Sequence, residues 1–299
     1  MTVTAGGSTA AGGPRVDGHE LLLGVVLTPD AGDPGRTVDL AVHAEQVGLD
    51  VVSVSDHPYR PDFLDAWTLL AWVAARTRRV IVLPNVATLH LRPPAGLARA
   101  AASLDALSGG RVELGIGAGG HGDAGHREGA PDRSVGGRVD AFEEALAVVR
   151  ALTTPGPPVT LDGRYHHLRD ALPGPAHPHP IGLWVGAVAP RMLGLVGRLG
   201  DGWIPSATRI PPSGLEAANA LVDAGARAAG RAPSDVRRLY NVPAPPPGLG
   251  AAGAARWAGR LADLALRHRI SGFLVFTDDR AVVSWLGGDV APRLRDAVG

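Results

Sequence analysis

The chain of 299 residues contains neither lysine nor cysteine, so all 29 of its basic residues are arginine. Without lysine, the protein cannot form a Schiff base, hold pyridoxal phosphate on a lysine or use a phosphate-loop lysine. Without cysteine, it cannot use a thiolate nucleophile or form a disulfide, a cysteine-ligated zinc site or an iron–sulfur cluster. Histidine is therefore the main side chain that can carry a proton near neutral pH.

Aromatic residues and unbalanced charge are also scarce. Aromatic residues make up 4% of the chain against 45% for all hydrophobic residues, which predicts an aliphatic core. The 29 acidic residues balance the arginines scattered among them, so we expect no nucleic-acid partner. The longest apolar run near the start, residues 21–27, is too short to cross a bilayer, so we expect no membrane contact.

The beginning of the chain differs from the rest. It has no basic segment followed by an apolar one, which argues against a secretion signal. We expect a flexible tail over residues 1–18 and a single domain over residues 19–299. The absence of cysteine is consistent with a cytoplasmic location.

After the tail, short aliphatic runs alternate with amphipathic helical segments. About eight such units predict an α/β fold in which an all-parallel sheet closes into a (β/α)8 TIM barrel. An open doubly wound sheet is the alternative, but the first strand–helix turn lacks the GxGxxG pattern of a dinucleotide-binding domain. The expected strands cover residues 21–29, 50–57, 80–88, 111–120, 182–188, 201–206, 237–244 and 272–278.

An insertion interrupts the alternation after the fourth expected helix. Residues 159–168 predict a hairpin around Asp162–Gly163, and a segment rich in proline and histidine continues to Pro180. We interpret the histidines of this insertion as surface or lid residues; they are His166, His167, His177 and His179.

The chemistry of a (β/α)8 barrel lies at the carboxyl ends of its strands. Among the residues there, His57 is the strongest candidate because it follows a strand directly and can exchange a proton near neutral pH. A structural histidine that bonds a loop carbonyl is the equal alternative. The candidates are Asp56, His57, Asn85, Val86, Ala87, Thr88, His90, Gly117, Gly119, Gly120, His121, Gly186, Ala187, Val188, Pro205, Ser206, Asn241, Thr277 and Asp278.

Two further segments suggest ligand contacts. Glycines across residues 115–129 would let the backbone approach a flat ring or a phosphate, although an ordinary flexible loop has the same composition. His121, Asp123 and His126 in this segment fit no zinc-site spacing, so we expect no metal. Residues 186–192 enter a helix directly after a strand, so free amides and Arg191 could form an anion site or be merely solvated.

From residue 21 to about residue 279, the sequence resembles the bacterial luciferase-like (β/α)8 superfamily, and within it the branch that uses the deazaflavin coenzyme F420. The segments that carry the resemblance include SDHPYRPDFLDAWTLLAWVAART, LDALSGGRVELGIGAG and PIGLWVGAVAPRMLGLVGRLGDGWIPS. The resemblance implies homodimers in many members. It also implies a histidine beside the deazaflavin ring, here His57, as a proton- or hydride-transfer partner, with His121 or His90 as secondary candidates.

The resemblance further implies where the cofactor would lie. The Asn85–Val86 peptide would be cis and would bulge behind the ring, while Gly117 and Gly119 would lie against the cofactor. Its phosphate would be held by residues 186–189 together with Arg191. Asp56, Ala87 and Thr88 complete the expected cofactor contacts, and Val188 and Ala189 belong to the phosphate segment.

The sequence also departs from the members of this family that oxidise sugar phosphates. Those members have a catalytic glutamate where this chain has Gly120 followed by His121, and a tryptophan where it has Pro61. They also bind the sugar's phosphate partly through lysines, which this chain lacks. The resemblance therefore disfavours oxidation of glucose 6-phosphate.

The leading hypothesis is an oxidoreductase that transfers hydride between F420 and a small organic substrate. The first alternative is an FMN-dependent monooxygenase that uses reduced flavin and oxygen. The second is a catalytically silent flavin-binding protein, because a fold does not determine a function.

Overall fold

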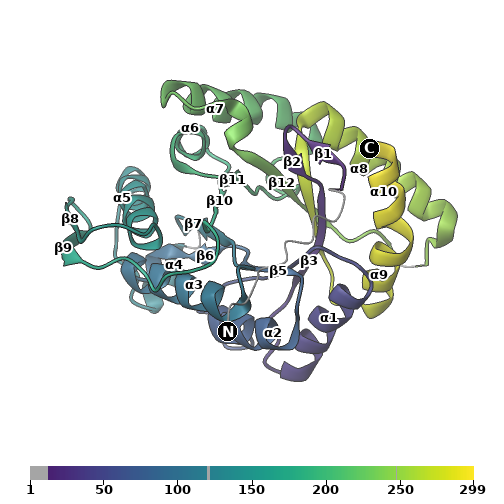
Figure 1. Cartoon of the computed structure of the whole chain (residues 1–299), viewed down its shortest axis with the longest axis horizontal. Helices are drawn as coiled ribbons and strands as arrows, with labels where there is room; N and C mark the ends of the chain where they lie inside the picture. The colour runs from purple at the N-terminus through teal and green to yellow at the C-terminus, as the bar shows by residue number, and fades with distance from the viewer. Residues whose placement is uncertain (1–12, 120–121, 247) are drawn as a thin grey trace, which may run out of the picture.

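A parallel β-barrel forms the centre of the protein, as Figure 1 shows in the computed structural model, which describes residues 13–119, 122–246 and 248–299. The strands follow the sheet order β5-β4-β3-β13-β12-β11-β10-β7-β6. β5 and β6 are two halves of one strand, separated by Asn85 and Val86, and each half pairs with one neighbour. The described strands therefore close into the eight-membered ring that the sequence predicted. They are β3 (Leu22–Leu27), β4 (Val51–Val54), β5 (Ile81–Pro84), β6 (Ala87–Thr88), β7 (Leu114–Gly117), β10 (Leu183–Gly186), β11 (Gly202–Trp203), β12 (Arg237–Pro243) and β13 (Ile270–Phe276).

Helices surround the barrel and follow the strands in turn. The predicted helix signals function as expected: Asp65 caps the helix after β4 by accepting a hydrogen bond from the Thr68 amide at 2.9 Å. The helix after β6 begins at Pro94, and Gly109 ends it with a φ of 75°. The main helices are α1 (Pro34–Gln46), α2 (Ala66–Arg76), α3 (Pro94–Ser108), α4 (Gly122–Arg127), α5 (Val135–Thr153), α6 (Pro190–Leu199), α7 (Leu215–Ala228), α8 (Gly250–His268), α9 (Arg280–Trp285) and α10 (Ala291–Val298).

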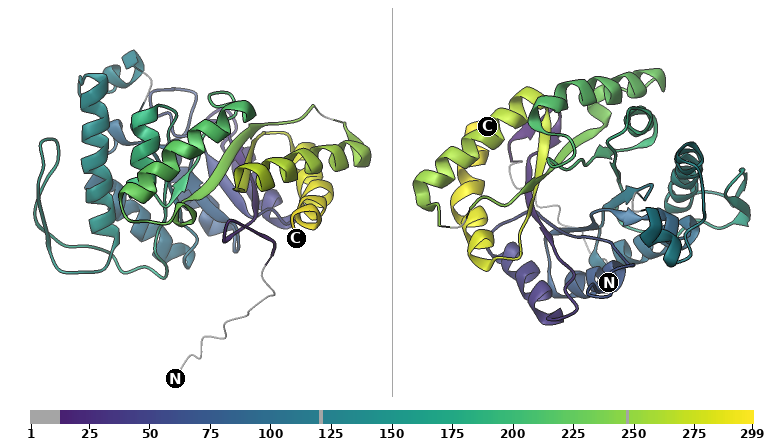
Figure 2. Two further views of the ribbon diagram at one scale, coloured as in Figure 1. Left: turned by 90° about the horizontal axis from the view of Figure 1, so that it is seen from above. Right: turned by 180° about the vertical axis from the view of Figure 1, so that it is seen from behind.

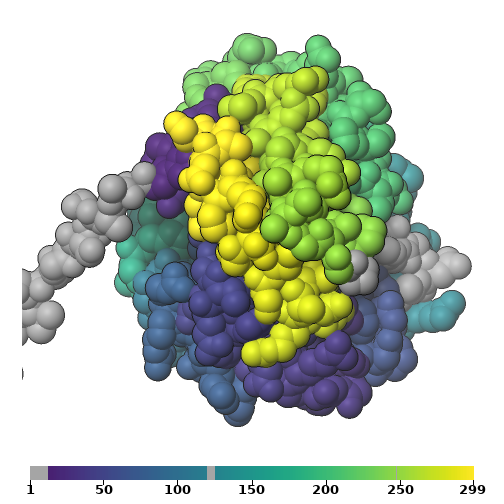
Figure 3. Space-filling model, turned by 90° about the vertical axis from the view of Figure 1, so that its right-hand side faces the viewer, coloured from purple at the N-terminus to yellow at the C-terminus, as the bar shows by residue number. Residues whose placement is uncertain are grey.

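The last helices close the outer layer beside the first. Figure 3 shows α8 and α10 side by side on this face, with α1 next to them. A short π-helical segment, Leu286–Val290, joins α9 to α10, and the rings of Trp257 and Trp285 lie 5.8 Å apart between α8 and α9. None of the helices in the described ranges has both the length and the apolar composition that a bilayer crossing requires.

Side chains fill the interior of the barrel. Successive residues of β3 alternate between the barrel interior, where Leu22 and Val26 lie, and the helical layer, where Leu23 and Val25 lie. All six residues of β3 are buried, as expected for a parallel strand that is covered on both faces. Because the interior is packed, a ligand cannot bind inside the barrel, and the chemistry of the barrel itself is expected at the carboxyl ends of its strands.

Two β-hairpins lie outside the barrel. β1 (Arg15–Val16) and β2 (His19–Glu20) pair near the amino ends of the barrel strands, where Arg237 donates a hydrogen bond to the Glu20 carbonyl at 3.0 Å. The sequence predicted a flexible tail through residue 18, whereas residues 15–20 form this hairpin. β8 (Val159–Asp162) and β9 (His167–Ala171) form the predicted inserted hairpin beside α5 (Figure 2). Glu144 of α5 anchors its turn by accepting hydrogen bonds from three consecutive backbone amides.

Two histidines at the end of the insertion bond to groups inside the protein. The side chain of His177 is only 3% exposed and contacts two backbone carbonyls, while His179 lies 3.0 Å from the buried carboxylate of Asp105. The interpretation of these two histidines as surface or lid residues is therefore wrong. They anchor the insertion near the amino ends of the barrel strands.

Candidate active site

Asn85 and Val86 form a bulge between β5 and β6 at the carboxyl end of the barrel. The peptide bond between them is cis, as the resemblance implied. The side-chain amide of Asn85 donates to Asn241 of β12 at 2.9 Å, and Asn241 donates back at 3.0 Å. The same Asn85 nitrogen lies 3.3 Å from the hydroxyl of Ser53. This network of neutral groups joins three strands across the barrel.

Two strand-end glycines make room for the bulge. A Cβ atom on Gly117 would lie 2.8 Å from a methyl carbon of Val86, and one on Gly186 would lie 3.2 Å from it. The ends of β7 and β10 therefore pack against the Val86 side chain, which occupies the space where their own side chains would lie. The two glycines thus let the bulge form a compact surface at the barrel mouth, against which a flat ring could lie.

Asp56 follows β4 and shapes the loop that carries His57. Its side chain is 1% exposed; one carboxylate oxygen accepts from the Thr88 amide at 2.9 Å, and both accept from Arg92 at 2.7 and 2.8 Å. Burial alone would lower the pKa of Arg92, but its hydrogen bonds to Asp56 and Asp65 raise it above its ordinary value. The sequence predicted a cofactor contact for Asp56, whereas the structure uses its carboxylate to tie β4 to β6.

His57 lies half-buried one residue further along this loop. Its Nδ1 atom is 2.7 Å from the hydroxyl of Tyr59, and its ring centroid lies 6.1 Å from that of Phe63. Burial and the charge of Asp56 raise the pKa of Tyr59, so the phenol stays protonated at neutral pH. A phenol can donate to Nδ1 or accept from it, so Tyr59 orients the imidazole in either protonation state.

His90 and Gly119 lie against each other at the rim of the barrel. A Cβ on Gly119, whose φ is 76°, would overlap the His90 ring at 1.6 Å, and one on Gly125 would lie 2.5 Å from the same ring. Gly119 was expected to contact the cofactor. The His90 ring, however, fills the space where a side chain at this position would lie. The other secondary candidate, His121, lies outside the described residues, as does Gly120.

The segment predicted to hold a phosphate follows β10. Ala187 is buried and its carbonyl accepts from the indole of Trp203 at 3.0 Å, whereas Val188 is 40% exposed. α6 then begins at Pro190 without a side-chain cap, so its first-turn amides are directed at the rim. Arg191 forms an ion pair with Asp140 of α5, so a phosphate held by its guanidinium would share it with that carboxylate.

Several residues of the site carry no signal in the sequence. Ser53 contacts Asn85, and Arg92 contacts Asp56, and both partners are more than 30 positions away in the sequence. Tyr59 contacts His57 across a loop turn, and only this closeness could be read from the sequence. Asn241 was recognised as a strand-end residue, but its pairing with Asn85 across 156 positions depends on closure of the barrel.

Comparison with known proteins assigns the chain to a family. The model of the family described as luciferase-like monooxygenase matches residues 17–245. An F420-dependent glucose-6-phosphate dehydrogenase from Gordonia bronchialis is 37% identical over 195 residues, which cover 62% of this chain and 57% of that protein. The match thus spans less than two thirds of that relative. The protein of the same name from Kineococcus radiotolerans is 33% identical over 241 residues, 75% of this chain and 68% of the relative.

Solved structures share the fold at lower identity. An F420-dependent secondary alcohol dehydrogenase in complex with an F420–acetone adduct superposes with a TM-score of 0.75 at 23% identity, over 94% of this chain and 99% of that one. The F420-dependent tetrahydromethanopterin reductase from Methanopyrus kandleri gives 0.76 at 19% identity, over 92% and 99%. A monooxygenase from Streptomyces bottropensis gives 0.71 at 20% identity, over 91% and 99%.

Proposed function

The chain belongs to the luciferase-like monooxygenase family, and we propose that it is an oxidoreductase that transfers hydride between coenzyme F420 and a small organic substrate. The observation that carries the proposal is the Asn85–Val86 bulge, packed on Gly117 and Gly186 at the barrel mouth, with the half-buried His57 on a loop of the same barrel end. The names of the Gordonia and Kineococcus relatives favour F420 as the cofactor.

The residues at the mouth divide into two groups by their task. Val86, Gly117 and Gly186 would contact the face of the cofactor ring, and the exposed amides at the start of α6 would face its phosphate. When bound, the deazaflavin supplies the hydride chemistry. His57 would exchange a proton with the substrate oxygen, and Tyr59 would hold the imidazole in place by its contact at Nδ1.

We propose that the substrate is not glucose 6-phosphate, although the relatives carry that name. The chain has no lysine to hold the phosphate of such a sugar, and Pro61 replaces the tryptophan that the resemblance calls for. Arginine and backbone amides are the groups left for an anionic substrate.

The test is a binding titration of the purified protein with F420 and with FMN, followed by spectroscopy. We expect F420 to bind more tightly than FMN. Gly186→Val should weaken F420 binding, because its side chain would overlap Val86 and displace the bulge against which the ring would lie. Gly194→Ala on α6 is the matched control, since its added carbon meets no atom within 4 Å. Tight binding of FMN without binding of F420 would contradict the proposal.

An FMN-dependent monooxygenase is the second candidate, favoured by the shared fold of the Streptomyces bottropensis monooxygenase. Oxygen consumption with supplied reduced FMN would identify it. A catalytically silent flavin-binding protein would bind cofactor without turning over any substrate. The cytoplasmic location and the homodimer stay predictions, and sedimentation of the purified protein measures the second.

A further inference from the structure

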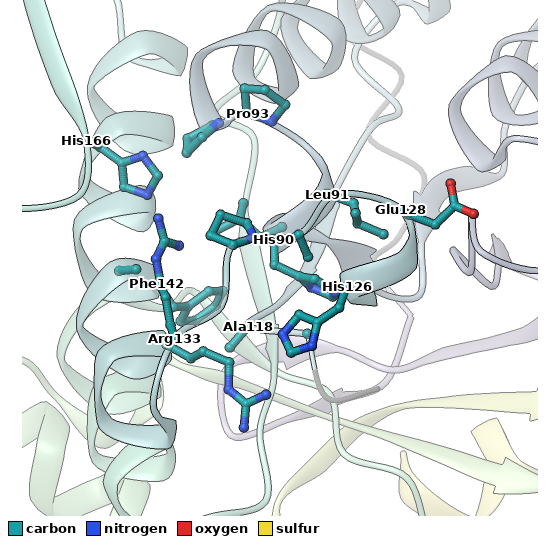
Figure 4. Close-up of a pocket in the computed structure, with 17 residues that line it drawn as sticks. His90, Leu91, Pro93, Ala118, His126, Glu128, Arg133, Phe142 and His166 are labelled. Carbon is teal, nitrogen blue, oxygen red and sulfur yellow. The ribbon is translucent and has the colours of Figure 1, made fainter. Parts of the chain in front are cut away.

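A cavity of about 340 Å³ lies beside the barrel mouth, between α3, α4 and α5 (Figure 4). Its volume falls in the range of small-molecule sites, roughly 300–1,000 Å³. His90 and Gly119 at the barrel rim form one wall, and the first two turns of α5 form another. The cavity thus belongs to the helical layer and adjoins the mouth without being part of the surface around Val86.

Two arginines on the α5 side line this cavity. Arg133 and Arg138 are half-buried, yet within the described ranges neither guanidinium makes a hydrogen bond or an ion pair. Arg133 is held only by stacking, with its guanidinium carbon 5.0 Å from the ring centroid of Tyr165. Other partly buried arginines of this protein, such as Arg92 and Arg238, are paired with carboxylates. Two unpaired guanidinium groups in one cavity therefore call for an anionic partner.

Among the residues whose side chains the structure describes, the other charged groups around the cavity form no ion pair with the two arginines. His126 and His166 add two more nitrogen-bearing side chains, and Figure 4 shows the Glu128 carboxylate directed away from His126 and Arg133. The Asp132 carboxylate lies 3.8 Å from His126, but its side chain is 94% exposed. Burial, together with the charge of Arg133, lowers the pKa of His166, whose ring already has a hydrogen bond with the backbone of Ala141.

The remaining wall is apolar. Phe142 and Leu89 are buried behind the charged groups, and Pro93 closes the side towards α3. A free inorganic ion would leave this surface without a contact, whereas an organic molecule can cover it while its charged end meets the arginines.

We propose that this cavity binds a carboxylate or phosphate group carried by a small organic molecule, with Arg133 and Arg138 as its ligands. A guanidinium binds either group through two parallel N–H donors, which gives both strength and orientation. The site goes beyond the proposed redox function and does not depend on it. The anionic group could belong to the phosphate–glutamate tail of a bound deazaflavin or to a substrate, and the experiment below separates these sources.

The experiment measures binding of inorganic phosphate and of glutarate to the full chain by calorimetry. We expect saturable binding, weakened about tenfold or more by Arg138→Gln, as loss of a charge-assisted hydrogen bond implies. Arg133→Gln is the second variant and should act in the same direction. Arg164→Gln is the matched control, because Arg164 also stacks on Tyr165, at 5.3 Å, but does not line the cavity. Only variants whose melting temperature equals that of the wild-type chain are compared in the binding measurement.

Absence of binding to the wild-type chain, or equal weakening by Arg164→Gln, would overturn the proposal. F420 and a deazaflavin that lacks phosphate and glutamate then identify the source. If Arg138→Gln weakens binding of F420 but not of the shortened deazaflavin, the anion is the cofactor's tail. If the substitution weakens binding of glutarate but of neither deazaflavin, the anion belongs to the substrate. Loss of phosphate binding in Arg138→Gln supports the cavity even if the protein binds no F420, so the two proposals fail separately.

Discussion

The two ends of the barrel treat polar groups differently. At the amino ends of the strands, charges are buried and paired: Arg238 with Asp223 at 2.6 Å, and His179 with Asp105 at 3.0 Å. At the carboxyl ends, the buried ion pair of Asp56 with Arg92 fixes the loop after β4, but the contact at the centre of the mouth is the neutral amide pair of Asn85 with Asn241. The paired charges hold the fold at both ends, while the centre of the mouth consists of the bulge, strand-end backbone and the His57 loop. Substitutions at the mouth should therefore change activity, and those at the opposite end should change stability.

The largest effect is expected for His57→Ala. If His57 carries the proton in turnover, its loss should lower kcat by about 100- to 10,000-fold, the usual contribution of a general acid or base. The melting temperature should change little, because the side chain is half-buried on a loop. Steady-state kinetics and thermal unfolding measure the two quantities.

His43→Ala is the matched control for His57→Ala. His43 is also half-buried and bonds one hydroxyl, that of Ser284 at 2.7 Å, but it lies on α1 in the helical layer. We expect turnover to be unaffected. A His57 variant that turns over substrate as fast as the His43 variant would refute the catalytic assignment.

Arg238→Ala should show the opposite pattern. The substitution removes the buried guanidinium that donates to Asp223 and Asn219, whereas Asp223 keeps its ion pair with Arg269. The cost in unfolding free energy should therefore be up to about 3–5 kcal/mol, the range for a buried pair that loses one partner. Urea denaturation measures this loss, and kcat per folded molecule should stay unchanged. Arg267→Ala removes an exposed pair with Asp263 and should cost less than about 1 kcal/mol. Equal losses for the two variants would mean that the buried cluster does not stabilise the fold.

The amide pair tests whether the mouth also depends on a polar contact for its shape. Asn241→Ala leaves the Asn85 amide partly unsatisfied, which costs about 1–3 kcal/mol, and should weaken cofactor binding by freeing the bulge. Adding Asn85→Ala should recover part of the stability, because no buried polar group then remains unpaired. Losses that simply add in the double variant would show that the two amides do not interact.

Whether a feature could be predicted from the sequence depends on how far apart its interacting residues lie along the chain. The strands and helices came from local periodicity and caps such as Asp65, and closure of the barrel followed from the number of units. His57 and Asn85 were found because strand ends converge in any such barrel. The pairing of Arg191 with Asp140 and of His179 with Asp105 was not predicted, because these partners lie 51 and 74 positions away. No local pattern reveals such a partner.

The last prediction concerns the pH dependence of stability that His179 confers. Hydrogen bonds to Asp105 and Glu113, against the opposing effect of burial, raise the pKa of His179 to about 10. Its pKa in the unfolded chain is about 6.5, so the folded state binds the proton more tightly. The resulting stabilisation is complete below about pH 6.5 and is lost as the pH rises towards 10.

Urea midpoints measured from pH 6 to pH 10 should therefore fall more steeply for the wild-type chain than for His179→Gln. His167→Gln provides the control, because His167 also pairs with an aspartate at 3.0 Å but on the exposed hairpin, where solvent screens the interaction. Its pH profile should follow that of the wild-type chain. If the His179 variant also follows the wild-type profile, protonation of this histidine does not stabilise the fold. The stabilising role of paired charges at the amino ends of the strands then depends on Arg238 and Asp223 alone.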